Sequence, residues 1–284
     1  MSKRKNKKST QKLALPKVLL FDIETAPIIA HVWSLWENNV SLNQIVADWH
    51  VLSWSAKWLE SEDKKQLYGP HCKIMYSDQR KAKNIEDDKA LLQGIWDLLN
   101  EADIVITQNG KSFDTKKLNA RFLMNGFQPP GSVKHIDTKI IASKVFAFTS
   151  NKLEYMTDKL NVKYKKLKHT KFPGHEMWTQ CLAGNLEAWK EMETYNKYDV
   201  LALEELYHKL IPWDNSLNFN LYHDEVDHVC KCGSTTFIKN GFYYTGSGKF
   251  QKHKCKSCGT EHRDKANLFS KEKKASLKMA TPKS

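Results

Sequence analysis

Residues 17–24 read KVLLFDIE, an apolar run that ends in two carboxylates. A short aliphatic run of this kind predicts a buried β-strand. Side chains alternate along a strand, so Asp22 and Glu24 point to one face and Phe21 and Ile23 to the other. The pair alone could be a solvated strand end. Two carboxylates side by side repel each other, however, unless they share a cation, so this strand end is a candidate metal site.

A second acidic position follows another strand-like run, IVIT at residues 104–107. The next residues include NGKSFD at 109–114, in which Asn109 and Gly110 predict a turn and Asp114 lies at the start of a helix. An aspartate in this place could simply be a helix N-cap.

The segment YNKYD, residues 195–199, belongs to a long helical pattern. Tyr195 and Asp199 are four residues apart and therefore share one helix face. That face continues through three leucines, Leu203, Leu206 and Leu210. An ionised carboxylate on an apolar stripe is costly unless a charged partner such as a metal ion meets it.

The motifs DIE, NGKSFD and YNKYD, in this order, resemble the three signature motifs of the DEDD exonuclease superfamily in its tyrosine variant (DEDDy). The stretches IETAPIIAHVWSLWENNVSLNQIV, VLSWSAKWL and SNKLEYMTDKLNV also resemble uncharacterised, often phage-borne, ribonuclease H-like proteins that end in a zinc ribbon. The resemblance covers about residues 16–264. It implies an α/β fold, a ribonuclease H-like mixed β-sheet flanked by helices, plus a small C-terminal zinc ribbon.

This resemblance also implies a two-metal catalytic site. Four carboxylates would bind two Mg²⁺ or Mn²⁺ ions: Asp22, Glu24, Asp114 and Asp199. Tyr195 would hold or help deprotonate the attacking water, with a metal-bound hydroxide nearby because a free phenol has a pKa of about 10. Asn109 and Phe113 would shape the substrate pocket beside the terminal nucleotide.

Four of the six cysteines gather near the C-terminus: Cys230, Cys232, Cys255 and Cys258. Four thiolates can enclose one tetrahedral Zn²⁺ ion in a structural site. The first pair is CxC, one residue shorter than the CxxC of the zinc ribbons that the segment resembles. Three histidines therefore stay open as alternative ligands: His228, His253 and His262. The two isolated cysteines, Cys72 and Cys181, are expected to be inert buried thiols.

Between the cysteine pairs, the sequence predicts two strands joined by the glycine-rich turn TGSGK. Lysines alternate there with aromatic residues, a mixture suited to phosphate contacts and base stacking. The predicted nucleic-acid contacts are Lys239, Tyr243, Lys252 and Lys254. So small a module barely buries a core, so some of its aromatic rings must pack against the metal site. Protein binding is the alternative.

Tryptophans gather between residues 33 and 58: Trp33, Trp36, Trp49, Trp54 and Trp58. Such rings could stack on single-stranded nucleic acid. Packing in the core is the favoured interpretation, because large aromatic side chains dominate core energetics.

Length and charge fit this assignment. A chain of 284 residues holds one α/β domain plus an appendage, and a net charge of +13 favours a polyanionic partner. The partner is expected to be nucleic acid, DNA more than RNA. No apolar run is long enough for a membrane helix, and the basic start lacks the apolar segment of a secretory signal. We therefore expect a cytoplasmic protein, in the host cytoplasm if a phage encodes it.

The sequence divides into five parts. They are a basic disordered tail (1–12), a ribonuclease H-like DEDDy exonuclease domain (13–213), a linker (214–226), the zinc ribbon (227–264) and a second basic tail (265–284). The tails are Lys-rich and too poor in large apolar residues to order themselves.

Four helices are expected in the larger domain. They span residues 86–100, residues 115–125, a segment capped by Ser150 that carries Leu153, Met156 and Leu160, and residues 186–210 as one helix or a broken pair.

These patterns predict a metal-dependent 3′–5′ exonuclease that acts on DNA or RNA as a monomer, with no membrane partner. A polymerase or a recombination protein is a conceivable protein partner. The polarity and the exonucleolytic action follow from the resemblance alone. A structure-selective endonuclease on the same fold would use the same four acids. The other alternative is a non-catalytic nucleic-acid-binding replisome adaptor, and the complete set of acids argues against it.

Overall fold

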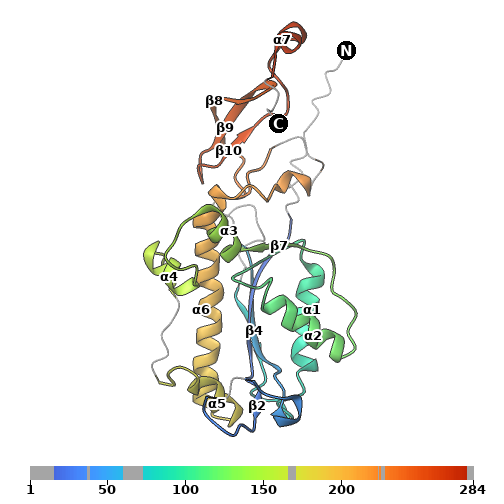
Figure 1. Ribbon diagram of the computed structural model, residues 1–284, viewed down its shortest axis with the longest axis vertical. Helices are drawn as coiled ribbons and strands as arrows, with labels where there is room; N and C mark the ends of the chain where they lie inside the picture. Colours follow the sequence, from blue (N-terminus) through green and yellow to red (C-terminus); the bar gives the residue numbers. More distant parts are fainter. Residues whose placement is uncertain are drawn as a thin grey trace, which may run out of the picture. The chain divides into compact units, whose positions relative to one another are not determined.

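A five-stranded sheet in the order β5-β4-β1-β6-β7 forms the centre of the unit that ends at residue 214 (Figure 1). The computed structural model describes residues 16–36, 39–59, 73–165, 171–222, 224 and 228–279. The strands are β1 (Val18–Thr25), β4 (Val51–Trp58), β5 (Met75–Asp78), β6 (Ile104–Thr107) and β7 (Lys134–Asp137). β1 runs antiparallel to β4 and parallel to β6, which confirms the predicted α/β class with a mixed sheet.

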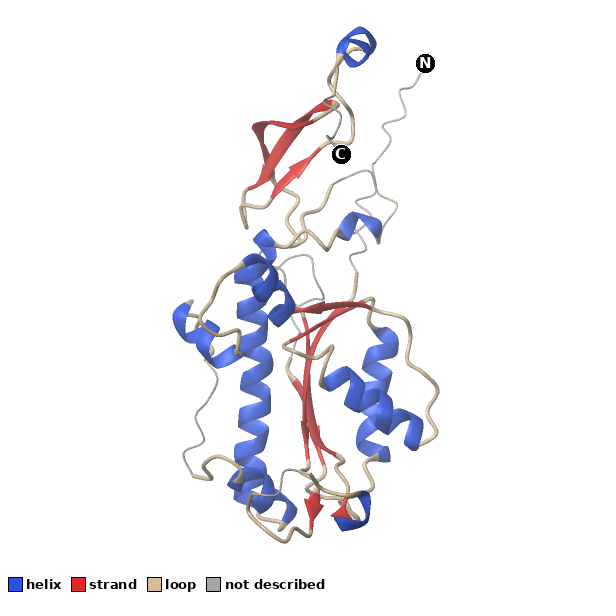
Figure 2. Cartoon of the chain, viewed as in Figure 1, coloured by secondary structure: helices blue, strands red, loops and turns tan. Residues whose placement is uncertain are grey.

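Helices cover both faces of this sheet (Figure 2). One face packs against α1 (Lys89–Glu101) and α2 (Asp114–Met124), and the other against α5 (Glu176–Leu182) and α6 (Leu186–Leu210). Two shorter helices, α3 (Thr138–Val145) and α4 (Leu153–Lys159), contact α6, and η3 (Ile211–Trp213) follows it. The small hairpin of β2 (Ile29–Ala30) and β3 (Ile45–Ala47) carries η1 (Leu42–Gln44) in its loop. None of the described helices has the length and apolar character to cross a membrane.

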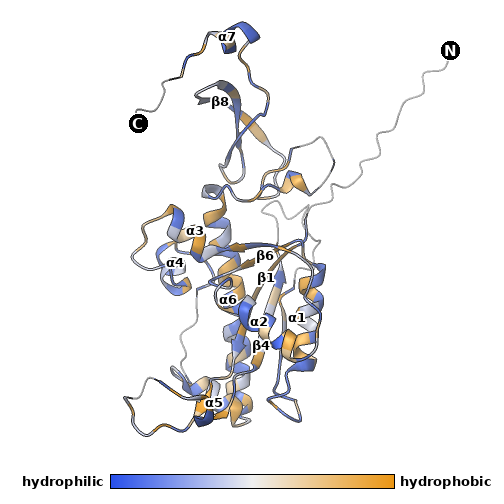
Figure 3. Ribbon diagram, turned by 45° about the vertical axis from the view of Figure 1, so that its right-hand side comes forward, coloured by the Kyte–Doolittle hydropathy of each residue, from blue (hydrophilic) through white to orange (hydrophobic). Residues whose placement is uncertain are grey.

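Successive side chains of β1 face the apolar core and the acidic site in turn, as the two-residue period of a strand predicts. Phe21 and Ile23 are buried in the core cluster that α1 and α2 complete. Figure 3 shows the central strands largely in the orange of hydrophobic residues. The carboxylates of Asp22 and Glu24 instead make hydrogen bonds to residues of α6 and α5. The two-residue period of the strand thus puts the core on one face and the acids on the other.

The structure settles two helix predictions, one of which needs correction. α6 is a single helix of 25 residues, one of the two alternatives that its pattern left open. α4 begins at Leu153 with Lys152 as its N-cap residue. Ser150 does not cap the helix, because its hydroxyl accepts a hydrogen bond from the backbone N–H of Lys152, two residues away.

Residues 215–279 include a second sheet in the order β10-β9-β8. Its strands are β8 (Phe237–Thr245), β9 (Gly248–Cys255) and β10 (Glu261–Arg263), and η4 (Phe219–Leu221) precedes them. β8 and β9 form the hairpin that the glycine-rich turn predicts. We call this part of the chain the C-terminal unit, and the preceding part the N-terminal unit.

The C-terminal tail contains more structure than the sequence predicts. Residues 271–276 form α7 (Lys271–Ser276), none of whose side chains is buried. Ser270 caps this helix by accepting a hydrogen bond from the backbone N–H of Lys273, and Glu272 lies in its first turn. Local capping accounts for this helix turn, which no core contact supports, within the segment expected to be a solvated tail. The N-terminal tail and Cys72 lie outside the described residues.

The five clustered tryptophans do not share one role. Trp54 is buried, and Trp58 packs against the same core cluster. Trp33 and Trp36 are 95% and 88% exposed, so the prediction that these two rings pack in the core is wrong. They lie in the loop between β2 and β3.

A buried ion pair links α1, α2 and β4. The carboxylate of Asp88 is fully buried and accepts hydrogen bonds from the Arg121 guanidinium at 2.7 and 2.8 Å and from the Val51 N–H at 2.9 Å. Asn125 adds a fourth donor at 3.1 Å. This carboxylate is therefore satisfied only while the two helices and the strand stay together.

Arg121→Met should lower the free energy of unfolding by about 3–5 kcal/mol, because it leaves a buried carboxylate without its cation. Urea denaturation of the variant and the wild type measures this difference. The matched control is Lys165→Met, which breaks an exposed ion pair with Asp158 and should change stability by no more than about 1 kcal/mol. Equal effects of the two substitutions would contradict the assignment.

Candidate functional site

Three carboxylates meet at the face of β1 that α6 covers. Oxygen atoms of Asp22, Glu24 and Asp199 all lie within 4.8 Å of one another. Asp199 is only 5% exposed, so little water screens its charge. The structure therefore brings together three of the four predicted acids, from two elements that are far apart in the sequence. Hard carboxylate oxygens at this separation suit a divalent cation such as Mg²⁺ or Mn²⁺.

The fourth predicted acid, Asp114, lies beside this group and outside it. β6 pairs with β1 only along Val18 to Leu20, so the N–H of Ile23 extends beyond the end of that pairing. Asp114, the first residue of α2, accepts a hydrogen bond from this N–H at 3.1 Å. Asp114 thus contacts the backbone of the residue that lies between Asp22 and Glu24 on the strand.

Burial raises the pKa of Asp114 to about 6, and the nearby charge of Asp137 acts in the same direction. The N–H of Ile23 acts against this shift, since it favours the ionised form. A cation bound nearby would favour ionisation further. Asp114 is not the N-cap of α2, because Phe113 occupies that position and the Asp114 carboxylate accepts from the N–H of Ile23 on β1.

Asn196, which was not among the predicted site residues, orients Asp22. Its amide nitrogen donates to Asp22 Oδ2 at 2.7 Å, and the Asn196 side chain is fully buried. The signal that could have found it is its position next to Tyr195 and three residues before Asp199, because a buried asparagine requires polar partners.

Tyr195 is buried one helical turn before Asp199, as the helix period predicts. Its ring makes an edge-on contact with the ring of Trp178 on α5, with centroids 6.1 Å apart at 81°. Trp178 was also missed by sequence analysis, and no local pattern marks it, since its partners are distant in the chain.

The turn before α2 is rigidly held. Asn109 adopts a φ of +67°, and a Cβ on Gly110 would lie 2.3 Å from the Thr107 hydroxyl oxygen, so only glycine fits there. Asp137 accepts hydrogen bonds from the backbone N–H groups of Asn109 and Lys111. The Asn109 side chain accepts hydrogen bonds from Ser112 and Lys139, and the Phe113 ring is 39% exposed. These two predicted pocket residues thus lie on the loop that leads to Asp114.

A cavity of about 670 Å³ lies directly after the acidic strand end. Its lining includes Thr25, Ile28, Trp49, Lys117, His175 and Trp178, but not Asn109 or Phe113. The Lys117 ammonium lies 3.8 Å from the centroid of the Trp49 ring, and burial lowers its pKa. The cavity therefore combines aromatic walls with one cation beside the carboxylates.

The four C-terminal cysteines converge in the C-terminal unit. Their sulfur atoms all lie within 4.8 Å of one another, with Cys230 and Cys258 at 3.5 Å and Cys232 and Cys255 at 3.7 Å. A tetrahedral zinc site with bonds of about 2.3 Å requires sulfurs about 3.8 Å apart. The CxC pair therefore does not prevent four-sulfur ligation. Cys181, by contrast, is a buried single thiol whose pKa burial raises to about 12, as expected of an unreactive residue.

Two of the three alternative histidines lie beside this cysteine group. His262 Nε2 is 3.3 Å from Cys230 Sγ, and His262 Nδ1 is 3.2 Å from His228 Nε2. Burial lowers the pKa of His262 to about 4, so its ring is neutral. His253 pairs with Asp264 at 3.0 Å. Among the described residues, the grouped ligand atoms are the four sulfurs, and His262 lies within hydrogen-bond distance of one of them.

The four predicted nucleic-acid contacts do not share one face of the C-terminal sheet. Along β9, Lys252 and Lys254 lie on the face of Phe250, and the β-pairing adds Tyr243, opposite Phe250, and Arg263, opposite Lys252. Lys239 pairs with His253 and so lies on the other face. The sequence could not show this, because a β-bulge between Lys239 and Phe242 shifts the alternation.

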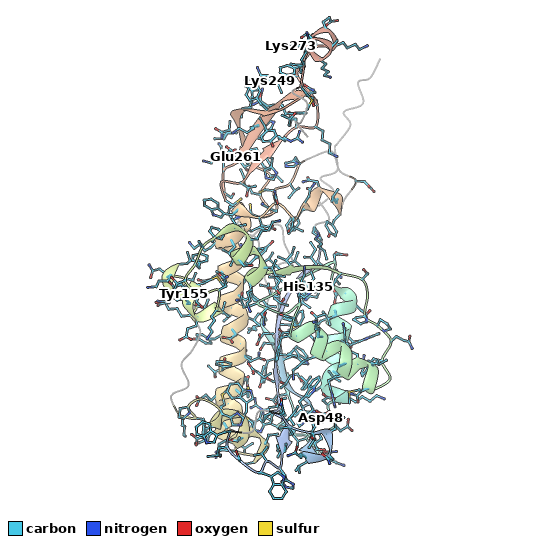
Figure 4. The ribbon with its side chains drawn as sticks, in the orientation of Figure 1. Asp48, His135, Tyr155, Lys249, Glu261 and Lys273 are labelled. Atoms are coloured by element: carbon cyan, nitrogen blue, oxygen red, sulfur yellow. The ribbon has the colours of Figure 1, made fainter. Side chains whose placement is uncertain are left out.

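Some residues on the face of Phe250 already contact one another. The Arg263 guanidinium lies 4.3 Å from the Phe250 centroid and 5.3 Å from that of Tyr243, and Lys252 pairs with Glu261 at 3.0 Å. Figure 4 labels Glu261 on β10 and Lys249 on β9. Lys249 directly precedes Phe250 on the strand, so its side chain lies on the other face of the sheet. Tyr243 remains 46% exposed and Lys254 is exposed. This face offers both a ring and free positive charge to a ligand.

The comparisons with known proteins define the family. A family model described as the RNase H superfamily matches residues 50–211, more than half of the chain, and the chain belongs to this superfamily. The matched region includes Asp114, Tyr195 and Asp199, while β1 with its two acids precedes it. No curated protein matches the chain.

One solved structure similar to this chain is a family B DNA polymerase from the hyperthermophilic archaeon Pyrobaculum calidifontis. The sequence identity is 17% and the TM-score is 0.46, with 70% of this chain and 25% of the polymerase covered. The chain thus corresponds to about a quarter of that polymerase.

Proposed function

We propose that this protein is a metal-dependent 3′–5′ exonuclease of the DEDDy type, which hydrolyses phosphodiester bonds of DNA or RNA. The observation that carries the proposal is the group of three carboxylate oxygens from β1 and α6 within 4.8 Å. Membership of the RNase H superfamily supports a nuclease acting on nucleic acid. The net charge of +13 supports a polyanionic substrate. The polarity and the tyrosine variant rest on the resemblance of the three motifs.

The residues at the site fit divalent cations. Their donors are hard oxygens, and the neutral amide of Asn196 orients Asp22 without competing for the cation. Asp22, Glu24 and Asp199 would hold the metal ions, and Asp114 would complete the set. Bound Mg²⁺ or Mn²⁺ ions would polarise the phosphodiester group and lower the pKa of a water molecule. Tyr195 would orient that water by a hydrogen bond from its hydroxyl group.

We also propose that the cysteine group holds one structural Zn²⁺ ion, which makes residues 227–264 a zinc ribbon. Its support is the close match between the sulfur separations and those of a tetrahedral site. Residues 13–213 would then form the catalytic domain and 214–226 the linker. The ribbon would bind substrate through the face of Tyr243 and Lys254, and contribute no catalytic group.

Asp199→Ala should reduce cleavage to background while the protein stays folded, because a metal ligand is lost and repulsion among the three acids is relieved. Cleavage is measured by digesting end-labelled DNA and RNA, single- and double-stranded, in the presence of Mg²⁺ or Mn²⁺. Thermal melting shows whether each variant is folded. Asp22→Ala and Asp114→Ala should behave alike, and Tyr195→Phe should lose about 10²- to 10⁴-fold. The control Asp158→Ala removes an exposed carboxylate and should cleave as the wild type does. An Asp199→Ala variant that is less stable yet active would contradict the assignment.

The same assay distinguishes the alternatives. A 3′–5′ exonuclease shortens a linear strand from its 3′ end and leaves a circular single strand intact. Cutting of the circle would instead show a structure-selective endonuclease. Tight nucleic-acid binding without cleavage in either metal would show a non-catalytic adaptor.

Purified protein should contain about one zinc ion per chain, and Cys230→Ser should lose it, because a structural site needs all four thiolates. His228→Ala should keep its zinc. His262→Ala should bind zinc about 10- to 100-fold more weakly, since it loses a hydrogen-bonding contact with a ligating sulfur. Zinc content by elemental analysis and competition with a chelator measure these effects. Full zinc retention by Cys230→Ser would show that the ligand set is wrong.

Lys254→Gln should reduce the salt dependence of single-strand binding by about 0.7 in the slope of log K against log[salt], the value of one phosphate contact. Fluorescence anisotropy across a salt series measures the slope. Lys239→Gln makes the same change on the other face of the sheet and should leave the slope unchanged. An equal loss with Lys239→Gln would contradict the choice of face.

A further inference from the structure

Trp178 touches two residues of the proposed catalytic site at once. Its indole Nε1–H donates to Glu24 Oε2 at 3.1 Å. The same ring meets Tyr195 edge-on, with centroids 6.1 Å apart at 81°. The contact to Glu24 joins residues that are 154 positions apart in the chain, so only the tertiary fold creates it.

The short helix α5 is anchored in a way that fixes this ring. Met177 and Cys181, on either side of Trp178, are fully buried in the core cluster that contains Trp189 and Met192 of α6. These contacts hold α5 against α6, and Trp178 packs partly buried against the same cluster. The ring therefore has a defined place beside the end of β1.

We propose that Trp178 is a positioning residue, which fixes the Glu24 carboxylate through its N–H and the Tyr195 ring through its edge. This inference rests on the proposed function, because it gives the two residues a reason to be held. Glu24 has a long side chain near the end of β1, just before the β-bulge in its pairing with β4, so the strand alone does not orient its carboxylate.

The chemistry of indole suits this task. Its N–H group is a donor only and carries no charge. A lysine or arginine in the same place would also orient the carboxylate, but its positive charge would oppose the binding of a cation. Asn196 is likewise a neutral donor to Asp22, at 2.7 Å. Each acid of β1 thus accepts a hydrogen bond from a neutral group, which orients the carboxylate without adding a positive charge beside it.

Trp178 also lines the neighbouring cavity, together with Thr25, the residue after Glu24. The ring that donates to Glu24 is therefore part of the wall of the cavity next to the acidic strand end.

Trp178→Phe removes the N–H and keeps an aromatic ring against Tyr195. We expect Mn²⁺ to bind this variant about 10- to 100-fold more weakly than the wild type, the usual effect of losing a hydrogen bond to a metal ligand. Isothermal titration calorimetry with Mn²⁺ alone measures this without any nucleic acid. The matched control is Trp96→Phe, which loses an indole hydrogen bond to the Gln128 carbonyl oxygen, away from the acids, and should bind Mn²⁺ as the wild type does.

A second variant tests the contact with Tyr195. At saturating Mn²⁺, Trp178→Phe should retain most of the wild-type kcat, whereas Trp178→Ala should lower it further, because Tyr195 then loses its neighbour. A merely structural role predicts lowered thermal stability with unchanged Mn²⁺ affinity. Wild-type Mn²⁺ affinity in Trp178→Phe would overturn the role toward Glu24, and equal kcat values for the two variants would overturn the role toward Tyr195.

The Mn²⁺ titration also separates this inference from the proposed function. If the wild type binds Mn²⁺ but cleaves no nucleic acid, the exonuclease proposal fails, and the comparison of Trp178→Phe with Trp96→Phe still decides the role toward Glu24. A wild type that binds no Mn²⁺ overturns both.

Discussion

The mutual repulsion of three carboxylates within 4.8 Å is the constraint on which the rest of the structure depends. Like charges this close, with Asp199 largely shielded from water, destabilise the fold unless protons or cations compensate them. The protein supports this arrangement with an apolar core behind it, in which Phe21 and Ile23 anchor β1 from the opposite face. Apolar packing on one face of β1 thus holds the strand in place. The carboxylates on its other face therefore stay close together despite their repulsion.

Neutral donors then hold the acids in place. Asn196 donates to Asp22, Trp178 donates to Glu24, and the backbone N–H of Ile23 donates to Asp114. None of these donors carries a charge, so the site keeps its attraction for cations. The last donor is available because the pairing of β1 with β6 ends at Leu20. The topology of the sheet therefore contributes directly to the site.

Local periodicity explains how much of the site the sequence predicts. The strand period places Asp22 and Glu24 together, and the helix period places Tyr195 one turn before Asp199. The partners of Asn196 and Trp178 could not be predicted from local patterns, because they are 174 and 154 residues away in the chain. The exposed Trp33 and Trp36, and the position of Lys239 across a β-bulge, also depend on tertiary geometry that residue type does not encode. In the C-terminal unit, cysteine spacing predicts the sulfur group, while the contact between His262 and Cys230 follows only from the tertiary fold.

The central claim is that the carboxylates of β1 and α6 together bind divalent cations. Its most direct test is a crystal structure of the protein soaked in Mn²⁺, with an anomalous difference map recorded at the manganese edge. If these carboxylates bind divalent cations, the map contains an anomalous peak in contact with oxygens of Asp22, Glu24 and Asp199. A map with manganese elsewhere but no peak at these three residues would contradict the claim.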